Sequence, residues 1–173
     1  MFLFGCNIII PLSVLYLIYI CNKRPDKIIY RSNNEIYLER WHLLPRNNIM
    51  NIYLHCFHDS DLEELHDHPW LFNISILLFG SYNEIVPERP ELWTHYAAGP
   101  VRKIMRHAGE LPVFRFKSSV HRIELISPTV WTIFITGPVI DTWSFYCQDK
   151  IVNHEDFLDN TVPGINKKGR GCD

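Results

Sequence analysis

The amino-acid sequence predicts an all-β domain built as a closed sandwich or barrel. Short segments in which apolar and polar residues alternate recur along the chain, and turns rich in proline, glycine and asparagine separate them. No convincing amphipathic helix is expected beyond the N-terminal region. The 173 residues are 47% hydrophobic and 13% aromatic, which is enough for one domain with a substantial core. Because closure removes exposed strand edges, a closed arrangement fits this series of short strands.

The expected strands follow one another between residues 28 and 147. They cover residues 28–30, 35–44, 49–57, 73–79, 81–86, 93–97, 101–106, 113–116, 121–126, 130–136 and 142–147. Gly80 permits a tight turn between two of them, and residues 59–65 and 155–158 could each form one helical turn. The chain then divides into an apolar segment (1–22), a β-barrel (23–158) and a polar, flexible tail (159–173).

The N-terminal segment predicts membrane attachment. Residues 2–21 are dense in apolar side chains and contain no charge, and about 20 such residues suffice for a membrane-spanning helix. Lys23, Arg24 and Lys27 follow directly, so the positive-inside rule places the β-domain in the cytoplasm. We expect a transmembrane helix with a cytoplasmic β-domain. The alternative is a soluble cytoplasmic protein in which this segment is a buried first strand or is not translated.

Charge and cysteine content exclude several classes of function. The net charge is −2 and no long run of lysine or arginine occurs, so no nucleic-acid partner is expected. The five cysteines are scattered and include no Cys-x-x-Cys pair. We therefore expect neither a zinc–cysteine site nor a disulfide framework, and a reducing compartment is the simpler interpretation.

Three histidines are the candidates for metal binding. His66 and His68 are separated by one residue on an extended segment, so their side chains project to the same side. His121 begins a segment in which it shares a face with two apolar residues, which directs its imidazole inward and requires a partner there. A metal ion or a hydrogen bond would each supply that partner. Neutral imidazole binds iron, zinc, copper and nickel.

These motifs resemble those of the cupin superfamily. The spacing from His66-x-His68 through Asn73 to Gly80 resembles the first cupin motif, with Asn73 where the family usually has glutamate. Gly109-Glu110 followed by His121 resembles the second motif. The sequence is most similar to small phage and bacterial cupin-like proteins with a His-Asp-His-Pro-Trp core, a later His-Arg strand and a Trp-Thr-x-Phe-x-Thr-Gly-Pro stretch. The resemblance extends over residues 35–147 and implies a double-stranded β-helix, or jelly-roll, barrel.

The resemblance also implies a set of site residues. His66, His68 and His121 would be the metal ligands, and three-histidine iron sites occur in cupins that resemble thiol dioxygenases. Asn73 could be a weak fourth ligand, and Glu84 could act from outside the ligand set. The remaining candidates are residues that could bind a substrate, namely Tyr82, Arg115 and Arg122.

Three functions follow from these residues. The first is a mononuclear non-heme iron dioxygenase that acts on a small anionic or thiol substrate, with Fe(II) as cofactor and Zn, Ni or Mn as alternatives. The second is a non-catalytic cupin that serves as a binding or structural module. The third is a metal-independent sugar isomerase or epimerase with a histidine base. A small-molecule partner is expected for the enzymes, and a homodimer is a further expectation.

Overall fold

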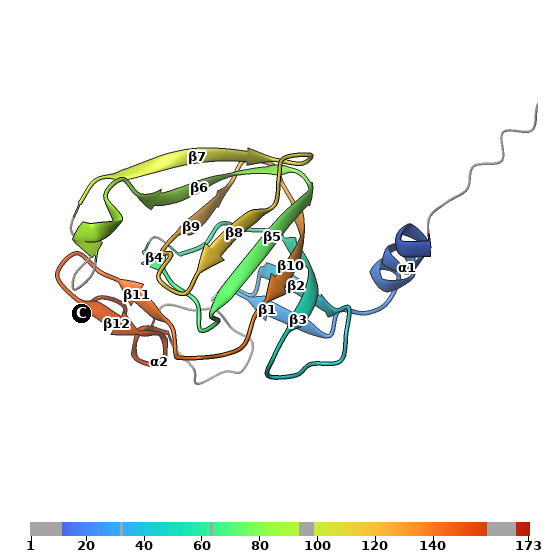
Figure 1. Ribbon diagram of the computed structural model, residues 1–173, viewed down its shortest axis with the longest axis horizontal. Coiled ribbons are helices and arrows are strands. Elements are labelled where there is room, and N and C mark those ends of the chain that lie inside the picture. The colour runs from blue at the N-terminus through green and yellow to red at the C-terminus, as the bar shows by residue number, and fades with distance from the viewer. Residues whose placement is uncertain (1–11, 32, 63, 94–98, 159–168) are drawn as a thin grey trace, which may run out of the picture.

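The strands form two antiparallel sheets that enclose one interior. The computed structural model describes residues 12–31, 33–62, 64–93, 99–158 and 169–173. The first sheet has the order β1-β2-β3-β10-β5-β8. Its strands are β1 (Lys27–Tyr30), β2 (Ile36–His42), β3 (Asn51–Phe57), β10 (Val130–Thr136), β5 (Phe72–Phe79) and β8 (Val113–Phe116). Figure 1 shows these strands wrapping around the interior together with those of the second sheet.

The second sheet consists of two three-stranded parts, β12-β11-β4 and β7-β6-β9. Its strands are β12 (Ile151–Asn153), β11 (Ser144–Tyr146), β4 (Leu65–His66), β7 (Val101–His107), β6 (Ser81–Pro87) and β9 (Arg122–Leu125). An antiparallel bridge between His66 and His121 joins the two parts. The layer therefore runs β12-β11-β4-β9-β6-β7, and the two histidines lie at the junction.

The order of the strands identifies the fold. From β3 to β11 each connection crosses from one sheet to the other, except the β6–β7 hairpin, whose two strands pair directly. Two sheets connected in this way form a jelly roll, or double-stranded β-helix. The prediction of an all-β jelly-roll domain is confirmed.

The alternation in the sequence sets which side chains face the interior. On β10 the four buried residues are Val130, Thr132, Phe134 and Thr136, while the residues between them are only partly buried. The outward-facing Trp131 stacks on Trp41 of β2 at 5.5 Å between ring centroids. The first sheet thus has a polar and aromatic inner face and an apolar outer face.

The predicted strands agree with the structure except near residue 93. Trp93 ends a short 3₁₀ helix, η1 (Pro90–Trp93), and residues 94–98 lie outside the described residues. Pro90 opens this helix, a position that suits the fixed φ of proline. The strand β12 was not predicted, because three residues are too few to establish an alternation. Of the two single-turn helices, only α2 (His154–Phe157) is present among the described residues.

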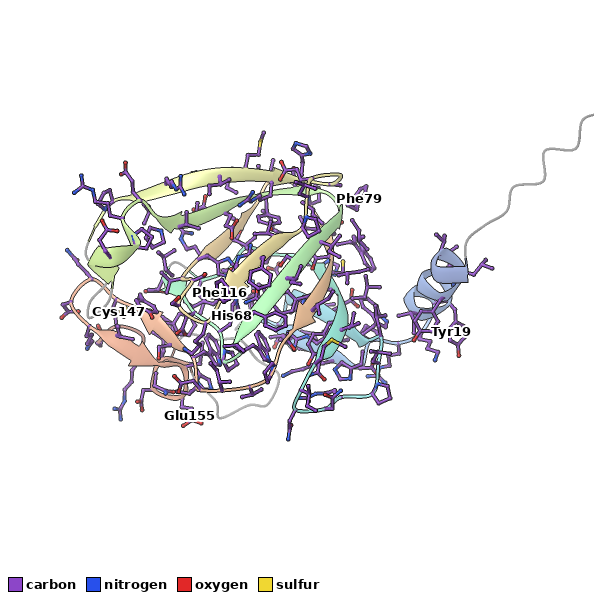
Figure 2. All side chains as sticks on the ribbon, viewed as in Figure 1. Tyr19, His68, Phe79, Phe116, Cys147 and Glu155 are labelled. Atoms are coloured by element: carbon purple, nitrogen blue, oxygen red, sulfur yellow. A yellow bond between two sulfur atoms is a disulfide. The ribbon has the colours of Figure 1, made fainter. Side chains whose placement is uncertain are left out.

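The N-terminal helix α1 (Leu12–Cys21) is ten residues long. It stands at one side of the two sheets in Figure 1, and Figure 2 shows Tyr19 on it. Ile20 joins an apolar cluster with Trp41, Leu54 and Cys56 on the outer face of the first sheet. Within the described residues, no helix is long and apolar enough to cross a bilayer. Residues 1–11 of the expected anchor lie outside that part, so the anchor stays a prediction.

The C-terminal segment makes contacts that the sequence did not predict. Cys147 and Cys172 form a disulfide with their Cα atoms 5.7 Å apart, whereas the sequence predicted no disulfide. The backbone N–H groups of Gly169 and Gly171 donate to the carbonyl oxygen of Phe157 at 2.8 and 3.2 Å. Residues 169–173 therefore contact the barrel, whereas residues 159–168 of the expected tail lie outside the described residues. A separation of 25 residues follows no cysteine motif, so only the fold brings the two thiols together, and the prediction of a reducing compartment loses its basis.

Candidate metal centre

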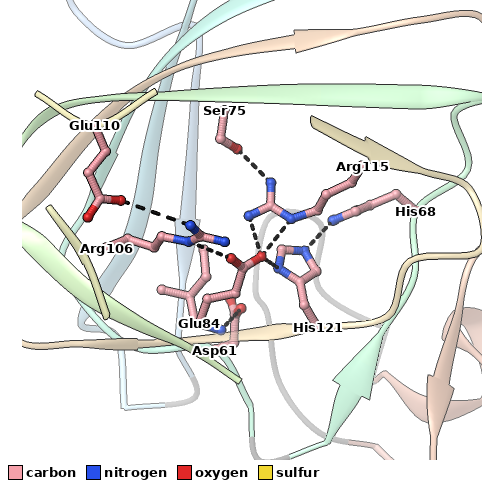
Figure 3. Close-up of polar contacts among 9 residues, drawn as sticks. Asp61, His68, Ser75, Glu84, Arg106, Glu110, Arg115 and His121 are labelled. Carbon is pink, nitrogen blue, oxygen red and sulfur yellow. Dashed lines mark hydrogen bonds and ion pairs between the residues drawn. The ribbon is translucent and has the colours of Figure 1, made fainter. Parts of the chain in front are cut away.

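The fold brings His66, His68 and His121 together inside the barrel. His66 and His121 exchange backbone hydrogen bonds of 2.9 and 3.0 Å across the junction of the second sheet. His68 follows two residues later, and one ring nitrogen from each of the three lies within 4.8 Å of the others. The Nε2 atoms of His68 and His121 are 2.9 Å apart. Figure 2 shows His68 among the side chains of the interior, and Figure 3 shows its contact with His121.

The separation between two of these nitrogens fits the binding of one transition-metal ion. Two imidazole nitrogens bound at about 2.1 Å and at a right angle to each other are separated by about 3 Å. The 2.9 Å between the Nε2 atoms of His68 and His121 agrees with that separation. The Nδ1 atom of His66 is buried and has no hydrogen-bond partner among the described residues. The three imidazoles thus match the donor set of a divalent metal such as iron or zinc.

Burial keeps two of these imidazoles neutral at physiological pH. Removal from water lowers the pKa of His68 well below its usual value, and the neighbouring His121 lowers it further. Burial also lowers the pKa of His121 to about 4, with Arg115 acting in the same direction. A neutral ring has a nitrogen lone pair available, which metal binding requires.

Glu84 orients the ring of His121. It lies on β6 with 2% of its surface exposed, and its Oε1 atom is 3.2 Å from Nδ1 of His121. This is ion-pair distance, although the angle is not that of a good hydrogen bond. Burial alone would raise the pKa of Glu84, but His121 and Arg115 outweigh burial and leave the pKa below its usual value. A carboxylate beside Nδ1 favours the proton there and leaves Nε2 free to bind a metal.

Two arginines hold Glu84 in place (Figure 3). Nε of Arg115 donates to Oε1 at 2.7 Å, and Nε of Arg106 donates to Oε2 at 3.0 Å. Arg115 also donates to the Ser75 hydroxyl at 3.1 Å. Because these groups occupy its guanidinium, Arg115 serves to position Glu84. The sequence named Arg115 as a substrate-binding candidate; its contacts in the structure are with Glu84 and Ser75, and the substrate-binding role stays a prediction.

The other sequence candidates lie in different surroundings. Tyr82 is buried and lines the cavity beside the histidines. Arg122 is not among the residues that line it, and its guanidinium pairs with Glu124 at 2.7 Å. Asn73 is fully buried and pairs in register with Thr136 and Arg115. Its amide has no hydrogen-bond partner among the described residues, and its ligand role stays a prediction.

A cavity of about 460 Å³ opens from the three histidines. Two of the histidines that line it, His55 and His154, were not singled out from the sequence. The ring of His154 stacks on Trp143 at 4.7 Å between centroids. His55 lies on a strand whose alternation directs it inward, and that alternation is the signal that could have identified it. The size of the cavity suits a small organic molecule.

A second group of possible ligands lies outside this cavity. Glu39, Cys56 and His58 each offer a ligand atom within 4.8 Å of the others. Glu39 and Cys56 are paired in register on β2 and β3, and His58 lies 2.8 Å from the Glu39 carboxylate. Sequence analysis did not connect these residues, because they meet only through the pairing of the strands.

Comparisons with known proteins found solved structures whose fold resembles that of this chain. No family model and no curated protein matches the sequence, so the resemblance to the smaller phage and bacterial group stays a prediction. Among solved structures, a protein with a double-stranded β-helix domain from Klebsiella pneumoniae is 14% identical, with 68% of this chain and 90% of that chain covered and a TM-score of 0.47. KdgF from a Halomonas species is 14% identical, with coverage of 60% and 82% and a TM-score of 0.44. A cupin superfamily protein from Desulfitobacterium hafniense is also 14% identical, with coverage of 75% and 89% and a TM-score of 0.43.

The fold of this chain rests on its own topology. The solved structures that resemble it include cupins and other double-stranded β-helix proteins. Its strands alternate between two facing sheets, and its histidines meet where the parts of the second sheet join. The chain therefore has a double-stranded β-helix fold, with a cluster of three histidines in its interior.

Proposed function

We propose that this protein is a mononuclear non-heme iron dioxygenase in which His66, His68 and His121 hold Fe(II). The observation that carries the proposal is the convergence of the three ring nitrogens within 4.8 Å beside a cavity of about 460 Å³. Zinc, nickel and manganese compete for the same donor set. The substrate enters through the cavity, as a small anionic or thiol compound.

Each group of residues has a distinct part in this function. A bound Fe(II) ion would supply Lewis acidity and open positions for dioxygen and substrate. His121 would offer its Nε2 lone pair to the ion, because Glu84 faces Nδ1 at 3.2 Å. The aromatic side chains of Trp70, Phe134 and Trp143 line the cavity and exclude water from its walls.

The test begins with the metal content of the purified protein. We expect about one equivalent of iron per chain, lost in His66→Ala because one of three donors is removed. His107→Ala is the matched control, since that histidine is exposed and pairs with Glu110 at 3.1 Å away from the cavity. Oxygen consumption with a panel of thiols and small acids then tests the chemistry. Equal iron in wild type and His66→Ala, or no oxygen consumption with any substrate, would contradict the proposal.

One observation favours a second function, a metal-independent isomerase or epimerase. The imidazole of His121 faces the Glu84 carboxylate, which is the arrangement of a histidine base held by an acid. In that enzyme, activity would survive removal of metal by a chelator and would disappear in His121→Gln. In the dioxygenase, a chelator and the substitution would both abolish activity.

A further inference from the structure

Arg40 lines the cavity and has unused hydrogen-bond donors. Its Nε donates to Nε2 of His55 at 2.8 Å, and its guanidinium carbon lies 4.8 Å from the centre of the Tyr53 ring. The described residues provide no acceptor for its two terminal nitrogens and no carboxylate within ion-pair distance. A guanidinium with two free N–H groups side by side matches a carboxylate, which accepts both.

Lys27 places a second positive charge directly beside Arg40. The two residues are partners in the register of β1 and β2, and both line the cavity. Like charges opposite each other on neighbouring strands destabilise a sheet unless an anion separates them. Among the described residues, no carboxylate forms an ion pair with Lys27 either. The pKa of Lys27 is lowered by partial burial and by the charge of Arg40.

Two carboxylates that could compensate these charges have other hydrogen-bond partners. Asp26 accepts from the backbone N–H of His42 at 2.7 Å. Asp61 lines the cavity, but it accepts from the Tyr37 hydroxyl and, at 2.7 Å, from the backbone N–H of Ile123. The Arg40–Lys27 pair is therefore a cationic end of the cavity with which no carboxylate of the described residues forms an ion pair.

Aromatic rings connect this cationic end to the histidines. The ring of Phe134 lies 5.3 Å from that of His55 and 6.1 Å from that of His68, between centroids. Trp70 lies 5.5 Å from Phe134 and 5.4 Å from His68. A ligand that reaches from Arg40 to the histidines thus passes along an apolar wall.

We propose that this cavity binds a carboxylic acid with an apolar body. The carboxylate binds Arg40 and Lys27, the body lies along Phe134 and Trp70, and the other end of the molecule reaches the three histidines. The role of the histidines rests on the proposed function, whereas the carboxylate site rests on the Arg40–Lys27 pair alone.

Calorimetric titration of the full chain with 3-phenylpropionate tests this site. We expect the acid to bind and the neutral amide of the same shape, 3-phenylpropionamide, to bind at least tenfold more weakly. Arg40→Gln and Lys27→Gln should each raise the dissociation constant for the acid roughly tenfold or more, because each removes a charged hydrogen-bond donor. Arg102→Gln is the matched control: it removes an exposed cation on β7 that does not line the cavity and should leave binding unchanged.

Equal binding of acid and amide, no binding of the acid to wild type, or unaltered binding in Arg40→Gln and Lys27→Gln would overturn the proposal. Thermal unfolding of each variant checks the fold, and if Arg40→Gln does not fold, Lys27→Gln decides. Iron content separates this inference from the proposed function. A protein without iron that still binds the acid through Arg40 refutes the iron enzyme only. A protein that contains iron, and that binds the acid equally well in Arg40→Gln and Lys27→Gln, refutes the carboxylate site only.

Discussion

At the scale of single residues, Glu84 connects the histidine cluster to the rest of the core. It is almost completely buried, and it contacts His121 on one side and two arginines on the other. A buried charge is tolerated only when its partners compensate for the loss of water. This carboxylate therefore stabilises the fold and fixes the orientation of a candidate ligand at the same time.

Replacing Glu84 by Gln should weaken both functions of the side chain. We expect a loss of about 3–5 kcal/mol in the free energy of unfolding, because the buried Arg115 keeps its charge without a partner. We also expect iron affinity to fall about 10- to 100-fold, because Nδ1 of His121 loses its carboxylate. Urea unfolding and competition with a chelator measure the two effects.

Glu124→Gln is the control, because Glu124 pairs with Lys103 and Arg122 near the surface. A surface pair of this kind contributes about 0–1 kcal/mol. Unfolding free energies and iron affinities that are equal in the two variants would refute the special role of Glu84.

At the scale of elements, the turn between β5 and β6 requires glycine. Gly80 has a φ of +86°, and a Cβ atom there would lie 2.5 Å from the carbonyl oxygen of Thr129. The strained backbone and the contact act together, so we expect Gly80→Ala to destabilise the protein by more than about 1 kcal/mol. Gly109→Ala is the matched comparison, since Gly109 has a φ of +92° but nothing within 4 Å of the added atom. Chemical denaturation should show the larger loss at Gly80, and equal losses would contradict the steric argument.

The attachment of residues 169–173 to the barrel depends on the Cys147–Cys172 disulfide. This disulfide closes a loop over a sequence separation of 25 residues. Reduction should lower the free energy of unfolding by about 2–4 kcal/mol, because the unfolded chain regains the freedom that the cross-link removes. Denaturation with and without dithiothreitol measures this loss. The double variant Cys147→Ser, Cys172→Ser is the control and should not respond to the reductant, whereas an unchanged wild type would refute the contribution.

At the scale of the whole molecule, the interior is polar as well as apolar. Histidines, glutamate and arginine occupy the space between the sheets, next to aromatic rings. Such an interior couples the protonation of buried groups to the stability of the entire domain.

Stability should therefore fall when the pH drops below about 6.5, the usual histidine pKa. Burial, together with the charge of Arg40, lowers the pKa of His55 well below that value. The unfolded chain then binds a proton that the folded chain does not bind, so unfolding becomes more favourable as the pH falls. His55→Gln, which keeps an acceptor for Arg40, should make the dependence shallower. Unfolding free energies measured between pH 7 and about 5 decide this, and identical slopes for the two proteins would contradict it.

The sequence alone was sufficient for the fold class and for most strands. Alternation with a period of two is a local property, because successive side chains of a strand face opposite sides. For that reason β5, β6 and β10 could be predicted within one or two residues. The inward direction of His121 followed from the same rule, and the structure directs it inward.

Other features were decided by tertiary structure, because they depend on residues that are distant in the sequence. These features are the disulfide and the ion pair of Arg115 with Glu84. Each depends on which segments the fold brings together. The meeting of Arg40 and Lys27 depends on the register of two strands. A local pattern fixes the face on which a side chain lies, but only the packing of the sheets fixes its neighbours.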